Sequence, residues 1–191
     1  MRATAVILSL AVVLSVFSGC MRRFGPEPET VPWVELSRYE GLWHEIASNP
    51  AFFNRNLVAV TAEYEAIGDG AVSVLNTGYV GTPDGRKRTI TGTATVVTPE
   101  TNSKLEVRFD PFPACLFAGS YWIVLLDDEA NEQPDQPYQY AVVTDNRQST
   151  MFVLAREPEL PESIYNTIKE TLEARNIDTS RLRITGTLTA S

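Results

Sequence analysis

Eight short apolar or alternating segments, separated by turn signals, constrain the fold of this chain most strongly. They span residues 43–48, 57–65, 71–80, 89–98, 105–109, 121–126, 138–144 and 150–156. Alternation with a period of two is typical of strands that bury one face, and β-branched and aromatic residues favour strands. Turn sequences such as Gly68-Asp69-Gly70 and Thr82-Pro83-Asp84-Gly85 lie between consecutive segments. We therefore expect eight antiparallel strands joined by hairpins.

Eight strands with nearest-neighbour connections favour an all-β, up-and-down barrel, because closure removes the exposed edges of an open sheet. A β-sandwich is the main competing architecture, and the strand count does not exclude it. One helix is expected after the strands. Pro161 suits its first turn, Asn176 its end, and Ile164, Tyr165, Ile168 and Leu172 form one apolar stripe. A single stripe predicts a helix packed outside the sheet.

The N-terminal segment has the pattern of a secretory signal peptide. Residues 5–17 form an apolar run after Arg2, too short to span a bilayer comfortably, and small residues follow it. Ser18-Gly19-Cys20 resembles the lipobox of bacterial lipoproteins, although Phe17 stands where Leu is usual. The resemblance implies cleavage after residue 19 and acylation of Cys20, by palmitate or a similar chain. The alternative is an ordinary signal peptide cleaved near Gly19.

These features divide the chain into a signal peptide at 1–19, a lipidated cysteine with a Pro- and Glu-rich tether at 20–36, and a globular domain at 37–191. Met21 is not Asp, which by resemblance to enterobacterial sorting favours the outer membrane, with the domain facing the periplasm. The net charge of −8 argues against nucleic acid as a partner. The membrane is then reached through the lipid anchor.

Enzyme and metal signatures are weak in this sequence. The one histidine, His44, has no partners at metal-ligand spacing, and no nucleophile elbow or phosphate loop occurs. Cys115 lies in an apolar segment and is interpreted as a small buried hydrophobe. We expect neither an enzyme nor a cofactor. A Cys115–His44 dyad in a lipid-modifying enzyme is a remote alternative.

Gly41-x-Trp43, Thr144-Asp145 and residues 152–158 are three short motifs that, taken together, resemble the lipocalin family, in its branch of bacterial outer-membrane lipoproteins related to apolipoprotein D. Gly41-x-Trp43, followed by Glu45-Ile46-Ala47, is similar to the first motif, with His44 in place of the usual Tyr. Thr144-Asp145 is similar to the second motif. Residues 152–158, with Arg156, are similar to the third. The resemblance covers residues 39–188 and implies that Arg156 packs over Trp43 at the closed end of the barrel, in a cation–π contact.

The alternation then predicts which residues face inward. Trp43, Glu45 and Ala47 should share one face of the first strand, and Phe152, Leu154 and Arg156 one face of the last. Small residues such as Gly92 leave volume in the interior, while Val96 and Phe109 join the inner wall. The predicted ligand-binding residues are Val60, Ala62, Tyr64, Val74, Asn76, Ile90, Ala94, Leu105, Val107, Trp122, Phe152 and Leu154. Both faces of 121–126 are apolar, and Trp122 is assigned inward from a resemblance to apolipoprotein D.

The function that this pattern indicates is binding, storage or transport of a small hydrophobic ligand of the fatty acid or lysophospholipid class. An apolar lining with a few polar groups suits such a ligand, and an eight-stranded barrel has room for one. The alternative is a structural or interaction lipoprotein of the envelope, with a barrel filled by its own side chains. The apolar loops at Phe52-Phe53 and 112–117 are expected to border the opening. Some relatives dimerise, so the resemblance leaves a homodimer open.

Overall fold

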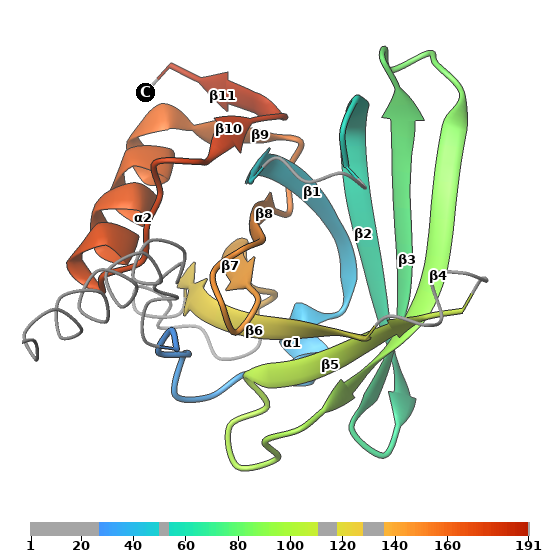
Figure 1. The fold of residues 1–191 in the computed structure, drawn as a ribbon, viewed down its shortest axis with the longest axis vertical. Helices are drawn as coiled ribbons and strands as arrows, with labels where there is room; N and C mark the ends of the chain where they lie inside the picture. Colours follow the sequence, from blue (N-terminus) through green and yellow to red (C-terminus); the bar gives the residue numbers. More distant parts are fainter. Residues whose placement is uncertain (1–26, 50–53, 111–117, 128–135, 191) are drawn as a thin grey trace, which may run out of the picture.

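The sheet of this protein closes on itself because its first and eighth strands pair (Figure 1). The structure is a computed structural model, and it describes residues 27–49, 54–110, 118–127 and 136–190. The barrel strands are β1 (Gly41–Ser48), β2 (Leu57–Gly68), β3 (Ala71–Val80), β4 (Lys87–Val96), β5 (Lys104–Phe109), β6 (Ala118–Leu126), β7 (Tyr140–Thr144) and β8 (Met151–Ala155). Each pairs antiparallel with the next. The predicted up-and-down barrel is confirmed, and closure excludes the sandwich.

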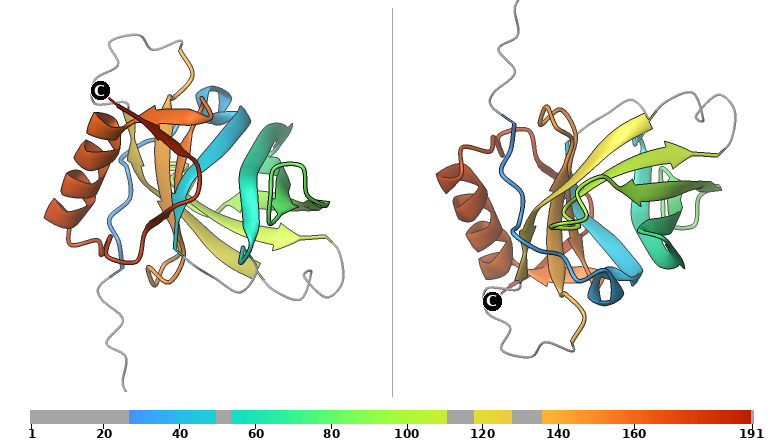
Figure 2. Two further views of the ribbon diagram at one scale, coloured as in Figure 1. Left: turned by 90° about the horizontal axis from the view of Figure 1, so that it is seen from above. Right: turned by 90° about the horizontal axis from the view of Figure 1, so that it is seen from below.

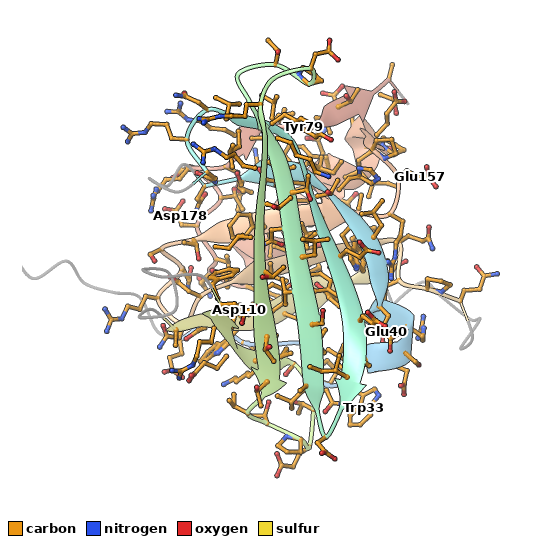
Figure 3. All side chains as sticks on the ribbon, turned by 90° about the vertical axis from the view of Figure 1, so that its right-hand side faces the viewer. Trp33, Glu40, Tyr79, Asp110, Glu157 and Asp178 are labelled. Atoms are coloured by element: carbon orange, nitrogen blue, oxygen red, sulfur yellow. The ribbon has the colours of Figure 1, made fainter. Side chains whose placement is uncertain are left out.

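The two ends of the barrel differ. In an up-and-down barrel, alternate connections lie at the same end, so the β2–β3 and β4–β5 connections share one end. The short helix α1 (Leu36–Tyr39) lies there too, and we call this the closed end. The described β3–β4 and β7–β8 connections lie at the opposite end, which we call the open end. Figure 3 looks onto β2, β3 and β4, with Tyr79 near the open end and Trp33 and Glu40 near the closed end.

Helix α2 (Glu162–Ala174) packs outside the barrel, as its apolar stripe predicts. Tyr165, Ile168 and Leu172 are buried in a cluster with outward residues of β1, β6, β7 and β8. Figure 2 shows α2 on the opposite side of the molecule from β3 and β4. Asn176 has a left-handed backbone, with φ of 59°, which is a common way to end a helix. No helix in the described part of the chain is long and apolar enough to cross a membrane.

Residues 31–36, which the sequence assigns to the tether, belong to the folded domain. Val31 and Val34 are buried in the same cluster as the barrel interior. The amide of Val31 donates to the carbonyl of Ile123, and that of Val34 to the carbonyl of Thr101. This part of the chain therefore crosses the closed end as a packed segment. The rest of the predicted tether up to residue 26, with Cys20, lies outside the described residues.

The end of β1 leaves β2 and pairs with the C-terminal segment instead. β1 pairs with β2 only from Gly41 to His44, whereas Ala47 and Ser48 pair with β10 (Arg183–Ile184). Figure 1 shows β1 curving away from β2 toward β10. Beyond β10, β11 (Thr187–Thr189) pairs in parallel with β9 (Glu159–Pro161). These three short strands are too brief to give a sequence pattern.

The inward orientation predicted for Ala47 is wrong, because β1 contains a bulge. The β1–β8 register shifts between Glu45 and Ala47. Ala47 therefore packs in the outer cluster under α2 instead of sharing the inner face with Trp43. Ser48, which pairs with Phe152, takes the inward direction in its place. A bulge adds one residue to one strand and so reverses the alternation that follows it.

Candidate functional site: the barrel interior and its floor

Trp43 and Arg156 form the floor of the barrel. Trp43 is fully buried, and the guanidinium carbon of Arg156 lies 4.0 Å from the centre of its ring. The indole nitrogen of Trp43 donates to the carbonyl of Tyr39 at 2.8 Å. The contact expected from the motif resemblance is therefore present in the structure.

Arg156 also ties three backbone segments together. Its Nε donates to the carbonyl of Tyr138 at 2.9 Å, Nη1 to that of Leu42 at 3.0 Å and Nη2 to that of Arg38 at 2.8 Å. Gly41 makes room for this arrangement. Its φ is +93°, and a Cβ there would lie 3.3 Å from Nη1 of Arg156. The Gly-x-Trp motif thus combines a left-handed backbone beside the arginine with the ring that the arginine covers.

Thr144 and Asp145 order the turn between β7 and β8. The Thr144 hydroxyl donates to the carbonyl of Thr150 at 2.7 Å. Oδ1 of Asp145 accepts from the amides of Arg147 at 3.1 Å and Ser149 at 2.7 Å. An Asp that binds the backbone amides ahead of it is a common way to fix a turn. These contacts give the second motif a structural role at the open end.

Most of the predicted lining residues face the interior. The interior cluster contains Ala62, Tyr64, Val74, Ala94, Leu105, Val107 and Leu154, with Val96, Phe109 and Phe152 packed against it. The strand register adds Asn76, which pairs with Ala62 and Ile90 and so shares their face. Val60 lies on the same side, since a Cβ on Gly78 would lie 3.3 Å from it. Contact of these residues with a ligand stays a prediction.

Gly92 marks a close approach in the wall. A Cβ at this position would lie 2.7 Å from the carbonyl oxygen of Arg108 and 3.0 Å from the ring of Phe109. The ring of Phe109 therefore fills part of the space beside Gly92, so Gly92 leaves less interior volume than the sequence predicts. Asn76, Ile90, Phe109, Tyr121 and Phe152 nevertheless keep partial exposure although they face inward. A tightly filled core would leave these side chains buried.

The inward orientation predicted for Trp122 is wrong. Trp122 pairs with Lys104, whose Nζ lies 3.8 Å from the centre of the indole ring, and Leu105 beside it faces inward. The inner face of β6 instead carries Tyr121 and Ile123. Because both faces of this strand are apolar, its sequence does not show which face points inward. Only the register with β5 determines this.

Tyr39, Tyr64 and Tyr121 meet inside the barrel above the floor, and we call them the tyrosine cluster. The hydroxyl of Tyr121 lies 2.8 Å from that of Tyr39 and 3.0 Å from that of Tyr64. The Tyr39 ring packs 4.9 Å from Trp43 and 5.6 Å from Tyr64, between ring centres. Of the three, only Tyr64 is predicted from the sequence as a residue of the inner wall. Tyr39 precedes the Gly-x-Trp motif by two residues, which is the one signal that could have indicated it.

A buried carboxyl lies where β1 leaves β2. Oε1 of Glu45 accepts from the hydroxyls of Ser48 at 2.8 Å and Thr185 at 2.7 Å. Glu45 is 6% exposed, and burial raises its pKa, an effect that the two hydroxyl hydrogen bonds partly offset. Thr185 follows β10, so this contact joins the C-terminal segment to the barrel.

The described residues offer no metal centre. They contain no group of three or more His, Cys, Asp or Glu placed to hold an ion. His44 pairs with Thr61 and Ala155 on the side of β1 opposite Trp43, so it faces away from the interior. Cys115, its partner in the remote enzyme alternative, lies outside the described residues, as do Phe52, Phe53 and the loop at 112–117.

Comparisons with known proteins agree with this geometry. Residues 34–187 match the family model described as Lipocalin-like domain. The chain is 35% identical to the outer membrane lipoprotein Blc of Vibrio cholerae, over 93% of this chain and 95% of that protein. It is 32% identical to temperature-induced lipocalin-1 of Arabidopsis thaliana, covering 83% and 82%. Insecticyanin from the tobacco hornworm Manduca sexta has a similar fold, with a TM-score of 0.59, 18% identity and coverage of 87% and 91%.

Proposed function

Because this chain belongs to the lipocalin family, we propose that it binds a small hydrophobic ligand of the fatty acid or lysophospholipid class inside its barrel. The observation that carries the proposal is the inner wall itself. Its side chains are mostly aliphatic or aromatic, and several keep partial exposure. The polar exceptions are Asn76, the tyrosine cluster, and the buried pair Glu45 and Ser48 on β1. An apolar pocket with a few placed polar groups is the usual form of such a site.

The test is a titration of the full chain, stripped of bound lipid, with a fluorescent fatty acid. We expect saturable binding at one ligand per chain. Ala62→Trp, which adds bulk to the inner face, should weaken binding at least about tenfold, since overpacking removes the space the ligand needs. Glu63→Trp changes the exposed neighbouring position on β2 and is the matched control. Absence of stoichiometric binding would instead favour the structural lipoprotein with a filled barrel.

We also propose that acylated Cys20 anchors the protein to the outer membrane, with the domain facing the periplasm. The support is the lipobox resemblance at residues 17–20 and the 35% identity to a protein named as an outer membrane lipoprotein. One acyl chain binds a membrane weakly and reversibly, so stable anchoring needs more than one. The barrel would then present bound lipid a short distance from the membrane that holds it.

A catalytic role has less support. His44 faces away from the interior, and the ligand we propose binds on the other side of β1. A lipid-modifying enzyme would release product from an ester or phospholipid, and Cys115→Ala would abolish that release. We expect no turnover by either form of the protein.

A further inference from the structure

The tyrosine cluster brings three hydroxyl groups together from distant parts of the chain. Tyr39 comes from α1, Tyr64 from β2 and Tyr121 from β6. The three are held in place by ring contacts, with Tyr64 and Tyr121 centred 6.0 Å apart and Tyr39 packed on Trp43. Tyr121 keeps partial exposure, so the cluster borders space inside the barrel.

The cluster has one more hydrogen-bond donor than the described structure uses. Each hydroxyl carries one O–H donor, which gives three donors. Only two contacts join them, Tyr39 to Tyr121 and Tyr64 to Tyr121, and these hydroxyls make no other hydrogen bond within the described residues. Whichever way the two hydrogen bonds run, one O–H has no acceptor in this part of the protein.

The hydroxyls remain protonated at neutral pH. Burial raises the pKa of all three tyrosines, that of Tyr64 to about 12. The cluster is therefore a donor site, and a buried donor without an acceptor costs free energy. Beneath it, Arg156 places a positive charge against the far side of the floor. That charge favours a group whose negative end points down toward the cluster.

We propose that the tyrosine cluster is a ligand subsite that donates a hydrogen bond to a carbonyl oxygen at the inner end of the ligand. The ligand then enters with its carbonyl end first, and its hydrocarbon chain extends toward the open end along Asn76 and Ile90. The proposal rests on the proposed function. Fatty acids and acyl esters both carry this oxygen.

The opposite orientation would place the polar end at the mouth of the barrel. Arg88 is exposed there and pairs with Gly78, a position on the inner face of β3. It could hold an anionic head group at the rim. The cluster would then meet the apolar tail and keep its unused donor. The two orientations make different predictions for the same variants.

The first experiment compares dodecanoic acid, methyl dodecanoate and dodecane as competitors of a fluorescent probe bound to the full chain. We expect the two oxygenated compounds to bind about fivefold tighter than the alkane, which corresponds to one hydrogen bond. The triple variant Tyr39→Phe/Tyr64→Phe/Tyr121→Phe removes every donor of the cluster and should bring this ratio close to one. Tyr165→Phe, in the outer cluster on α2, is the matched control and should leave it unchanged.

If the variant loses the tighter binding, relative to dodecane, of the acid alone or of the ester alone, that compound is the source of the carbonyl oxygen that the subsite uses. Either result supports the proposal. If the triple variant is too unstable to assay, the orientation measurement described next decides between the two arrangements. A ratio that the triple variant leaves unchanged overturns the subsite, as does a ratio of one in the unmodified protein. Failure of all three compounds to compete contradicts the proposed function as a whole, so the two failures are distinguishable.

The second experiment measures orientation. The chain has three tryptophans, and Trp33→Phe with Trp122→Phe leaves Trp43 at the floor as the fluorescent reporter. A fatty acid brominated beside the carboxyl should quench Trp43 more strongly than one brominated at the far end of the chain. Stronger quenching by the far bromine would place the tail at the floor and overturn the proposal.

Discussion

Arg156 stabilises the closed end by connecting segments that are distant in sequence. Its guanidinium binds the carbonyls of Arg38, Leu42 and Tyr138 and covers Trp43. We expect Arg156→Ala to lower the free energy of unfolding by about 2–4 kcal/mol, since hydrogen bonds to a charged group and a cation–π contact are lost together. Denaturant unfolding measures this change. The change in stability should be larger than the change in ligand preference, because Arg156 lies beneath the floor and acts on the ligand only through its charge.

The controls for this prediction separate charge from geometry. Arg156→Lys keeps the charge but loses the forked donor arrangement, so it should be intermediate in stability. Arg86→Ala, in the exposed β3–β4 turn, should be close to neutral. Unchanged stability of Arg156→Ala with loss of ligand binding would contradict the structural role.

Glu45 makes stability depend on pH. Because burial raises its pKa, the folded protein holds this proton more tightly than the unfolded chain does. The resulting stabilisation is complete at pH values below the unfolded pKa and is lost as the pH rises through the folded pKa. Glu45→Gln removes the charge and keeps an oxygen for the Ser48 and Thr185 hydroxyls. We expect this variant to gain stability relative to the unmodified protein as the pH rises from acidic to neutral.

Thermal melts across this pH range check the prediction. Glu45→Ala, which removes both hydroxyl hydrogen bonds as well as the charge, should be less stable than Glu45→Gln at every pH. A constant difference between Glu45→Gln and the unmodified protein across the range would show that the charge at this site carries no penalty.

At the scale of residues, the sequence predicts what depends on alternation and local motifs. Trp43 and Arg156 meet as the motif resemblance implies. In strands with one apolar face, such as β5, the sequence shows directly which residues point inward. Trp122 and Ala47 were misplaced for physical reasons. β6 is apolar on both faces, and the bulge in β1 reverses a pattern that the sequence does not mark.

Among the elements, α2 depends on a few buried contacts with the outside of the barrel. Leu172 is fully buried in the outer cluster, whereas Glu170 is exposed on the same helix. Leu172→Ala should therefore cost about 2–4 kcal/mol in chemical denaturation, because it leaves a cavity beneath the helix. Glu170→Ala is the matched control and should change stability by less than about 0.5 kcal/mol. Equal effects of the two variants would show that the helix does not pack as described.

Only elements that are long enough to show a periodic pattern can be predicted from the sequence. The eight barrel strands and α2 are long enough to show a period, and their order follows from the turns between them. Helix α1 has four residues and β10 two, so neither gives a recognisable pattern. Both are defined by tertiary contacts. Two members of the tyrosine cluster were missed for different reasons: Tyr39 because α1 is short, and Tyr121 because both faces of β6 are apolar.

For the whole molecule, the membrane anchor is the main prediction. Cys20→Ser should move the protein from the membrane fraction to the soluble fraction, because the acidic domain has no electrostatic attraction to an anionic bilayer. Fractionation of cells that express the two forms measures this change. Ligand binding by the purified domain should be the same in both. Retention of Cys20→Ser in the membrane fraction would point to attachment through another part of the protein.

The pairing of β1 with β8 and β10 has a consequence for the order in which the chain can assemble. Residues 44 and 155 must come together to close the barrel, and Ala47 pairs with Ile184 near the end of the chain. During synthesis the first strand is made early, yet both of its edges near the barrel mouth acquire their partners late. An unpaired strand edge is a site for aggregation. This edge is therefore open to intermolecular pairing until β8 and β10 are available.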